Sequence, residues 1–166
     1  EDIGEDIGED IGEDIGEDER GLLALEVQVW LELDAFFRGL AVKSGGAVPA
    51  PAQVLSLLPP PPAGAGWPTE FALLLLVRDL RKTAAAKRSM DMFNPMDDSE
   101  PYVPVGDPEY YPARRRIQRL SYVVWSLIRP RDGIGGLQGV LEAASTSDRL
   151  RMALVRLRAL REQTRS

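Results

Sequence analysis

Arginine is the side chain whose number and spacing in this sequence could do chemistry. Residues 110–166 hold twelve arginines against four acidic residues, which gives this third of the chain a net charge of +8. A guanidinium group is a planar fork of N–H donors that binds carboxylates and phosphates through paired hydrogen bonds. The pattern therefore predicts a basic, partner-binding face. Its expected members are Arg114, Arg115, Arg116, Arg119, Arg149, Arg151, Arg156 and Arg158.

A second candidate contact surface lies just before these arginines, in residues 91–112. The segment carries six acidic residues, no basic residue and five prolines. Proline at this density opposes a helix, and a long loop without regular structure is usually functional or disordered. We expect an extended acidic loop that binds a protein partner. Its expected aromatic anchors are Phe93, Tyr102, Tyr110 and Tyr111.

Cysteine and histidine are both absent from the sequence. Without thiol or imidazole groups, a structural zinc site, a cysteine nucleophile and a Ser–His–Asp triad are excluded. The acids of residues 91–112 lack the spacing and the central glycine of a calcium-binding EF-hand loop. We predict no catalytic residue, no metal and no cofactor, and hence a protein that is not an enzyme. An enzyme would need a site built from Asp, Glu, Lys, Arg, Tyr and Ser.

A glycine-rich stretch, residues 133–139, permits two interpretations. If residues 122–128 formed a strand, these glycines followed by a helix would imitate a dinucleotide-binding turn. The third glycine is misplaced for that motif, and Pro130 intervenes. A joint between two helices is the favoured interpretation.

The N-terminal residues 1–18 are a low-complexity acidic tail, with four copies of Glu-Asp-Ile-Gly followed by Glu-Asp. The first nineteen residues contribute −11 to the net charge of −6, so the remainder of the chain is +5. Repeated glycine and stacked acids oppose a helix, although the isoleucines would share one helical stripe. We expect disorder in isolation, and binding to the C-terminal arginines if the tail is ordered.

Three-residue and four-residue spacing of apolar side chains predicts four main helices. We expect them at residues 21–43, 68–92, 113–128 and 148–162, with Gly45-Gly46 ending the first and Ser147 capping the last. A short helix is expected at residues 137–144. Residues 47–68 form a Pro-rich connector, with one or two helical turns in 52–58 and a polyproline II spacer at Pro59–Pro62. The apolar faces of residues 22–40, 71–80, 117–128 and 150–160 are the expected core or oligomer interface.

These elements predict an all-α fold, a compact helical bundle formed by a single domain at residues 19–166. The longest apolar stretch, residues 71–77, is too short for a transmembrane segment. With no basic leader either, an intracellular location, cytoplasmic or nuclear, is expected.

For function, the sequence favours a non-enzymatic interaction or scaffold protein, a homo-oligomer that binds a protein partner through the acidic loop and the Arg-rich helices. The alternative is a nucleic-acid-binding or anionic-surface-binding protein whose acidic tail screens its own basic face. Arginine in place of lysine, Pro-rich joints and an acidic low-complexity tail are features that the chain shares with many small viral accessory proteins.

Overall fold

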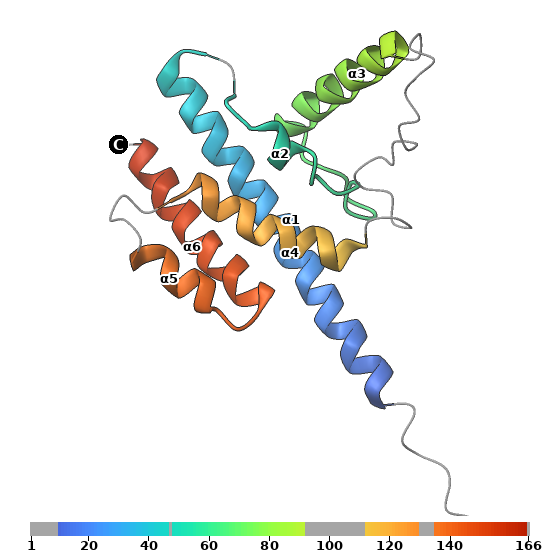
Figure 1. Cartoon of the computed structure of the whole chain (residues 1–166). Coiled ribbons are helices and arrows are strands. Elements are labelled where there is room, and N and C mark those ends of the chain that lie inside the picture. The colour runs from blue at the N-terminus through green and yellow to red at the C-terminus, as the bar shows by residue number, and fades with distance from the viewer. Residues whose placement is uncertain (1–9, 47, 92–111, 130–134, 166) are drawn as a thin grey trace, which may run out of the picture.

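The protein folds as an arrangement of α-helices, which confirms the predicted all-α class. The computed structural model describes residues 10–46, 48–91, 112–129 and 135–165. Within them the helices are α1 (Asp10–Ser44), α2 (Ala52–Leu55), α3 (Leu73–Asp91), α4 (Ala113–Leu127), α5 (Gly135–Glu142) and α6 (Thr146–Arg165) (Figure 1). The four long ones, α1, α3, α4 and α6, correspond to the four main helices that the sequence predicts.

Helix α1 is the longest element and begins well before the predicted start at residue 21. Adding a residue to an existing helix gains a hydrogen bond without a new nucleation cost. Acidic residues near a helix N-terminus also interact favourably with the helix dipole. These two effects act against the cost of the repeated glycines. The predicted end is confirmed, because Gly45 has a φ of 63° and the Gly46 N–H donates to the Ala41 carbonyl at 3.2 Å.

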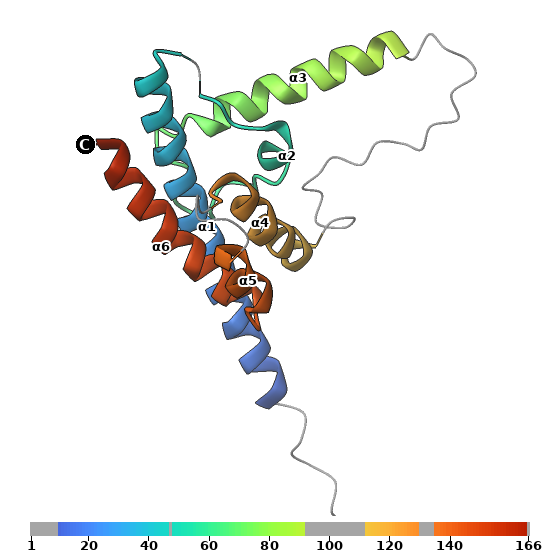
Figure 2. The same cartoon turned by 60° about the vertical axis from the view of Figure 1, so that its left-hand side comes forward.

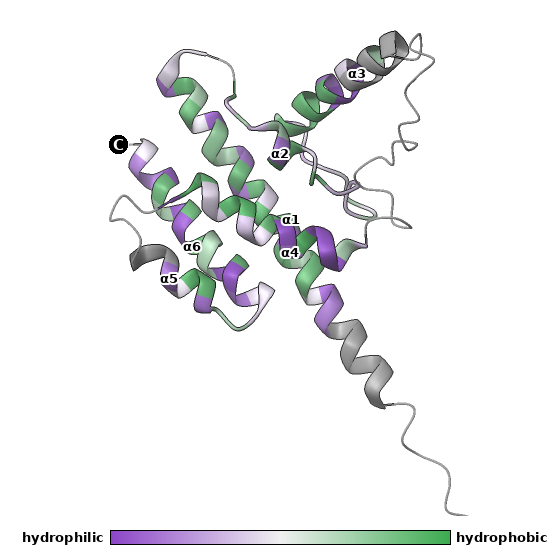
Figure 3. Cartoon of the chain, in the orientation of Figure 1, coloured by the Kyte–Doolittle hydropathy of each residue, from purple (hydrophilic) through white to green (hydrophobic). Residues whose placement is uncertain are grey.

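The core forms where α1, α4 and α6 pack against one another. Helices α1 and α6 run side by side in the same direction, and α4 packs against both (Figures 1 and 2). Gly39 allows α1 to approach α6 closely, because a Cβ at this position would lie 3.2 Å from Thr164 Oγ1. Colouring by hydropathy shows apolar segments on these helices where they meet (Figure 3). The most deeply buried apolar side chains include Val29, Trp30, Leu33, Ile117, Leu120, Val124, Leu150 and Leu157.

The Pro-rich connector is more than the spacer that the sequence predicts. Val54, Leu55, Leu57 and Leu58 are buried, and α2 packs against α3 and α4. The predicted turn of helix is present as α2. Because burying four large aliphatic side chains stabilises a fold by several kcal/mol, at about 1.5–3 kcal/mol each, residues 52–58 belong to the core.

Helix α3 is fixed at its base by a carboxylate from α1. The Leu73 N–H donates to Asp34 Oδ1 at 3.0 Å, and Arg38 Nε donates to Asp34 Oδ2 at 2.7 Å. A buried carboxylate at a helix N-terminus satisfies an unpaired N–H and is favoured by the helix dipole. The helix starts after the predicted residues 68–70, because Phe71 N–H bonds to the Pro68 carbonyl in a preceding turn. Beyond its base, α3 extends away from the other helices (Figure 2).

The start of α6 also differs from the prediction, because its cap is Ser145 and not Ser147. The Asp148 N–H donates to Ser145 Oγ at 3.1 Å, and the Ser145 hydroxyl donates to the Asp148 carboxylate at 2.7 Å. A serine hydroxyl that accepts from the third helical residue satisfies an otherwise unpaired donor. The short helix α5 likewise begins two residues before the predicted residue 137.

Helices α1 and α4 are joined by a buried ion pair. Arg116 Nε and Nη2 donate to the two Glu26 carboxylate oxygens, each at 2.8 Å, and the side chains are 7% and 1% exposed. Paired hydrogen bonds of this geometry have a fixed orientation. The pair therefore sets the position of α4 along α1.

Removing one partner of this pair should destabilise the protein strongly. We expect Arg116→Met to lower the free energy of unfolding by about 3–5 kcal/mol, because the Glu26 charge would stay buried without a partner. Adding Glu26→Leu should recover most of that loss. Guanidinium unfolding followed by circular dichroism measures both effects. The matched control, Arg115→Met on the exposed side of α4, should change stability by at most about 0.5 kcal/mol. Equal losses of unfolding free energy for Arg116→Met and Arg115→Met would contradict the structural role of the buried Arg116–Glu26 pair.

Candidate functional site

The eight arginines predicted to form one basic face are divided by the fold. Arg114, Arg115, Arg119 and Arg151 are exposed. Arg116 and Arg149 are buried, so the structure places these two inside the protein and not on a partner-binding face. Arg156 is half-buried, and Arg158 is exposed but paired with a carboxylate.

Arg149 is a buried cation held by neutral groups from three parts of the fold. Its Nε donates to Ser121 Oγ at 3.2 Å, its Nη1 to the Ala143 carbonyl at 3.1 Å and its Nη2 to Thr146 Oγ1 at 3.0 Å. The guanidinium also lies 4.6 Å from the centre of the Tyr122 ring. The unpaired carbonyls at the end of α5 carry partial negative charge and the aromatic face attracts cations, so both favour this charge. Arg149 therefore joins α4, the end of α5 and the start of α6.

Glu32 of α1 pairs with two arginines of α6. Arg158 Nε lies 3.2 Å from one carboxylate oxygen, and Arg161 Nη1 lies 2.8 Å from the other. Glu32 is only partly exposed, so the pairing is screened less than a fully solvated ion pair. One carboxylate offsets one positive charge, so Glu32 and its two arginines keep a net charge of +1.

Sequence reasoning missed the buried acids Glu26 and Asp34. Glu26 lies four residues after Leu22 and four before Trp30, both of which are buried. Asp34 lies four residues after Trp30. Residues four apart share a helical face, so this spacing was the signal that could have found both carboxylates. The matching signal for Arg116 is its place four residues before Leu120.

The exposed arginines gather at the N-terminal half of α4. Arg115 and Arg119 lie four residues apart and so on one helical face, and no ion pair among the described residues involves either of them. Arg114 is 75% exposed and its Nη2 lies 3.7 Å from Asp18 Oδ2 of α1. We call Arg114, Arg115 and Arg119 the α4 arginine surface.

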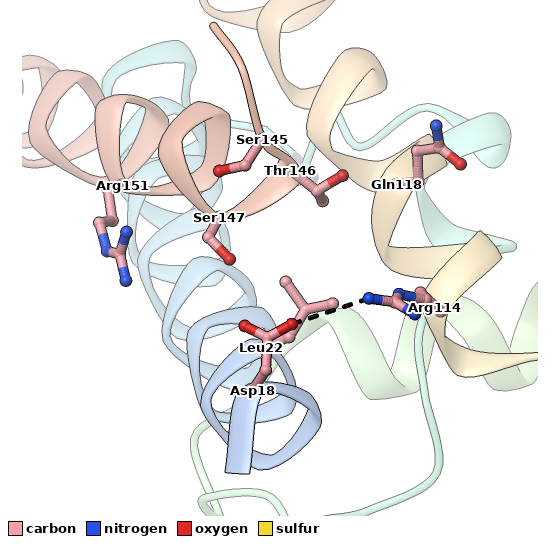
Figure 4. A pocket seen from close by; sticks show the side chains of 8 residues that line it. All are labelled: Asp18, Leu22, Arg114, Gln118, Ser145, Thr146, Ser147 and Arg151. Atoms are coloured by element: carbon pink, nitrogen blue, oxygen red, sulfur yellow. Dashed lines mark ion pairs between the residues drawn. The ribbon is translucent and has the colours of Figure 1, made fainter. Parts of the chain in front are cut away.

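A pocket of about 420 Å³ lies beside this surface, between the start of α6 and the facing parts of α1 and α4. In Figure 4, Arg114 points toward Asp18 across it, and the residues of the α6 start lie on the opposite side. Its guanidinium, amide and hydroxyl groups can donate hydrogen bonds to an anion, while the Asp18 carboxylate opposes one. The lining residues are Asp18, Leu22, Arg114, Gln118, Ser145, Thr146, Ser147 and Arg151.

Other predicted features meet the structure in different ways. The loop anchors Phe93, Tyr102, Tyr110 and Tyr111 lie outside the described residues. The dinucleotide-turn alternative loses its strand, because residues 122–127 are helical in α4. Within the described ranges, no cluster of three or more acidic, Cys or His side chains could hold a metal ion. No helix described here has the length and apolar character needed to cross a membrane.

Shortening the buried Arg149 side chain tests its joining role. We expect Arg149→Lys to lower the free energy of unfolding by about 1–3 kcal/mol, because an ammonium group cannot reach three separated acceptors and leaves some unpaired. Thermal unfolding by circular dichroism measures the loss. The matched control is Arg151→Lys, two residues along α6 and exposed, which should leave stability nearly unchanged. A loss of stability confined to Arg151→Lys, or an equal loss in both variants, would contradict the role of Arg149 in joining the three helices.

In comparisons with known proteins, no family model, no curated protein and no solved structure matches the chain.

Proposed function

We propose that this protein is a non-enzymatic interaction or scaffold protein that binds an acidic segment of a partner protein through the α4 arginine surface. The observation that carries the proposal is the exposure of Arg115 and Arg119 without an ion pair among the described residues. Their neighbour Arg116 is buried and binds Glu26 inside the core. Exposure therefore separates a structural arginine from two binding arginines within one helical turn.

The chemistry of the α4 arginine surface supports an acidic partner. Arg115 and Arg119 present guanidinium forks one helical turn apart, which suits two carboxylates on an acidic peptide. Exposed charges of this kind speed association and select partners more than they add affinity. An acidic and aromatic segment such as residues 91–112 of this chain has the complementary chemistry, and a partner protein would need a similar one.

A protein partner is favoured over nucleic acid because acidic groups lie close to the arginines. Asp18 lies 3.7 Å from Arg114, and Asp148 lies 3.3 Å from Arg151. A phosphate backbone carries a dense negative charge that these acids would repel. A peptide that places its few carboxylates beside Arg115 and Arg119 avoids the repulsion.

Nucleic acid remains the second candidate because of a separate basic surface on α3. Arg78, Arg81 and Lys82 are exposed on α3. Their spacing of three and four residues places them on one helical face, where each could contact a phosphate. This surface and the α4 arginine surface are on different helices, so variants can separate the two candidates.

Binding of a fluorescent Glu/Asp-rich peptide containing tyrosine tests the proposal. We expect Arg115→Gln with Arg119→Gln to weaken binding by about tenfold or more, because two charge-assisted contacts are lost. Fluorescence anisotropy at about 0.1 M salt keeps exposed charges effective. The matched control is Arg78→Gln with Arg81→Gln on α3, which should leave peptide affinity unchanged.

The same variants titrated with a single-stranded oligonucleotide test the second candidate. Tight oligonucleotide binding that falls with the α3 pair, together with a reduced salt dependence, would favour nucleic acid. Peptide affinity that is the same for parent and α4 variant would contradict the proposed function.

A further inference from the structure

A second pocket, of about 410 Å³, lies between the C-terminal halves of α1 and α6. In Figure 1 this is the end of the bundle that carries the C-terminus. Thr164 forms part of its α6 wall. We call it the basic groove, because its lining combines apolar and cationic residues. For brevity we call Ala35, Gly39 and Val42 its floor, and Arg38, Lys43 and Arg161 its edge.

The floor of the basic groove exposes apolar surface that the fold leaves uncovered. Val42 is 83% exposed, and Leu31 is another large exposed apolar residue on α1. Positions 31, 35 and 42 follow four-residue and seven-residue steps, so they share one helical face. Gly39 lies beside this strip, where α1 approaches Thr164. An occupant should therefore bring a line of aliphatic side chains.

The edge of the groove is cationic even though two of its residues already bind carboxylates. Arg38 uses its Nε on Asp34, and Arg161 uses Nη1 on Glu32. Each guanidinium has five N–H donors, so both arginines keep N–H groups that Asp34 and Glu32 do not use. Lys43 Nζ donates to the Gln163 carbonyl at 3.4 Å, which keeps its charge at the edge. An occupant should therefore also be acidic.

We propose that the acidic repeat of a second copy of this chain, residues 1–18, docks in the basic groove. The repeat carries ten acidic residues and no basic residue, with isoleucine at positions 3, 7, 11 and 15. A four-residue spacing places isoleucines on one stripe of a helix with acids on either side. This pattern matches an apolar floor with cationic edges, in the manner of an amphipathic helix bound in a groove.

The repeat cannot reach the groove of its own chain. Residues 10–44 form one continuous helix, in which Asp10 lies about 37 Å from Ala35 at a rise of about 1.5 Å per residue. Residues 1–9 span at most about 32 Å when fully extended. Residues 10–18 are fixed at the opposite end of α1 from the groove. The occupant must therefore come from another copy.

This interface deepens the proposed function, on which it rests, by naming a second copy of this chain as a partner of the scaffold. A copy carries the acidic repeat at one end of α1 and the groove at the other. Two copies with antiparallel α1 helices satisfy both contacts reciprocally and close into a dimer, while one-way docking builds a longer assembly. Both arrangements place residues 1–18 in a partner's groove.

Variants of the full chain test the groove directly by sedimentation velocity at about 0.1 M salt. We expect the parent to assemble above the 18.3 kDa of one chain. Val42→Glu should weaken assembly by about tenfold or more, because it places an acid on the floor that receives an acidic segment. The matched control is Val155→Glu on α6, also exposed (70%) but outside the groove, which should assemble like the parent.

A second variant replaces the four isoleucines of the repeat by serine and leaves the groove intact. We expect this variant alone and Val42→Glu alone each to assemble more weakly than the parent. Mixed together, they should recover one intact contact per pair, because one supplies the repeat and the other the groove. A repeat-serine variant that assembles like the parent would overturn the proposal in favour of another occupant. A parent that is monomeric, or a mixture that stays monomeric, would also overturn it.

Failure of this inference can be told apart from failure of the proposed function. Arg115→Gln with Arg119→Gln lies outside the groove and should change peptide binding without changing assembly. Val42→Glu should change assembly without changing peptide affinity of the single chain. Loss of both assembly and peptide binding in either variant would overturn the inference that the basic groove acts separately from the α4 arginine surface.

Discussion

The arrangement of helices depends on three carboxylates of α1, which need partners from neighbouring helices because they are buried or partly buried. A charge taken out of water destabilises the fold unless ion pairs and hydrogen bonds replace its hydration. Glu26 is met by Arg116 of α4, Asp34 by the N-terminus of α3 and Arg38, and Glu32 by arginines of α6. Each acid thus fixes a different helix against α1. Apolar burial supplies the stability, and these contacts select one packing among several that leucine-rich helices would allow.

Use of arginine inside the fold determines how much basic surface is left for a partner. A chain with so many arginines in its C-terminal third invites the interpretation of one broad polyanion-binding face. Burial removes Arg116 and Arg149 from that face, and Arg158 shares the Glu32 carboxylate with Arg161. The remaining α4 arginine surface has three members, and Asp18 lies beside one of them, Arg114. That geometry underlies the preference for a discrete acidic segment over a continuous phosphate backbone.

Much of the fold follows from the sequence, because long helices with strong apolar periodicity depend on local patterns. The end of α1 at Gly45-Gly46 and the span of α4 after Pro112 are examples. The burial of Arg116 and Arg149 could not be predicted from charge alone, since it depends on which helix supplies the opposing groups. Their acceptors include Glu26 and Ser121, which are 90 and 28 residues away in the chain. The core role of Leu57 and Leu58 likewise depends on the placement of α3 and α4.

The central claim is that the arginines of the C-terminal third divide into internal ties and external contacts. Solvent exchange of the arginine Nε–H protons, measured by ¹⁵N NMR, tests it residue by residue. The Nε–H groups of Arg116 and Arg149 donate to Glu26 and Ser121 inside the fold, so their exchange should require local opening and be slow. Those of Arg115 and Arg119 should exchange rapidly. Equally rapid exchange at all four arginines would contradict the account.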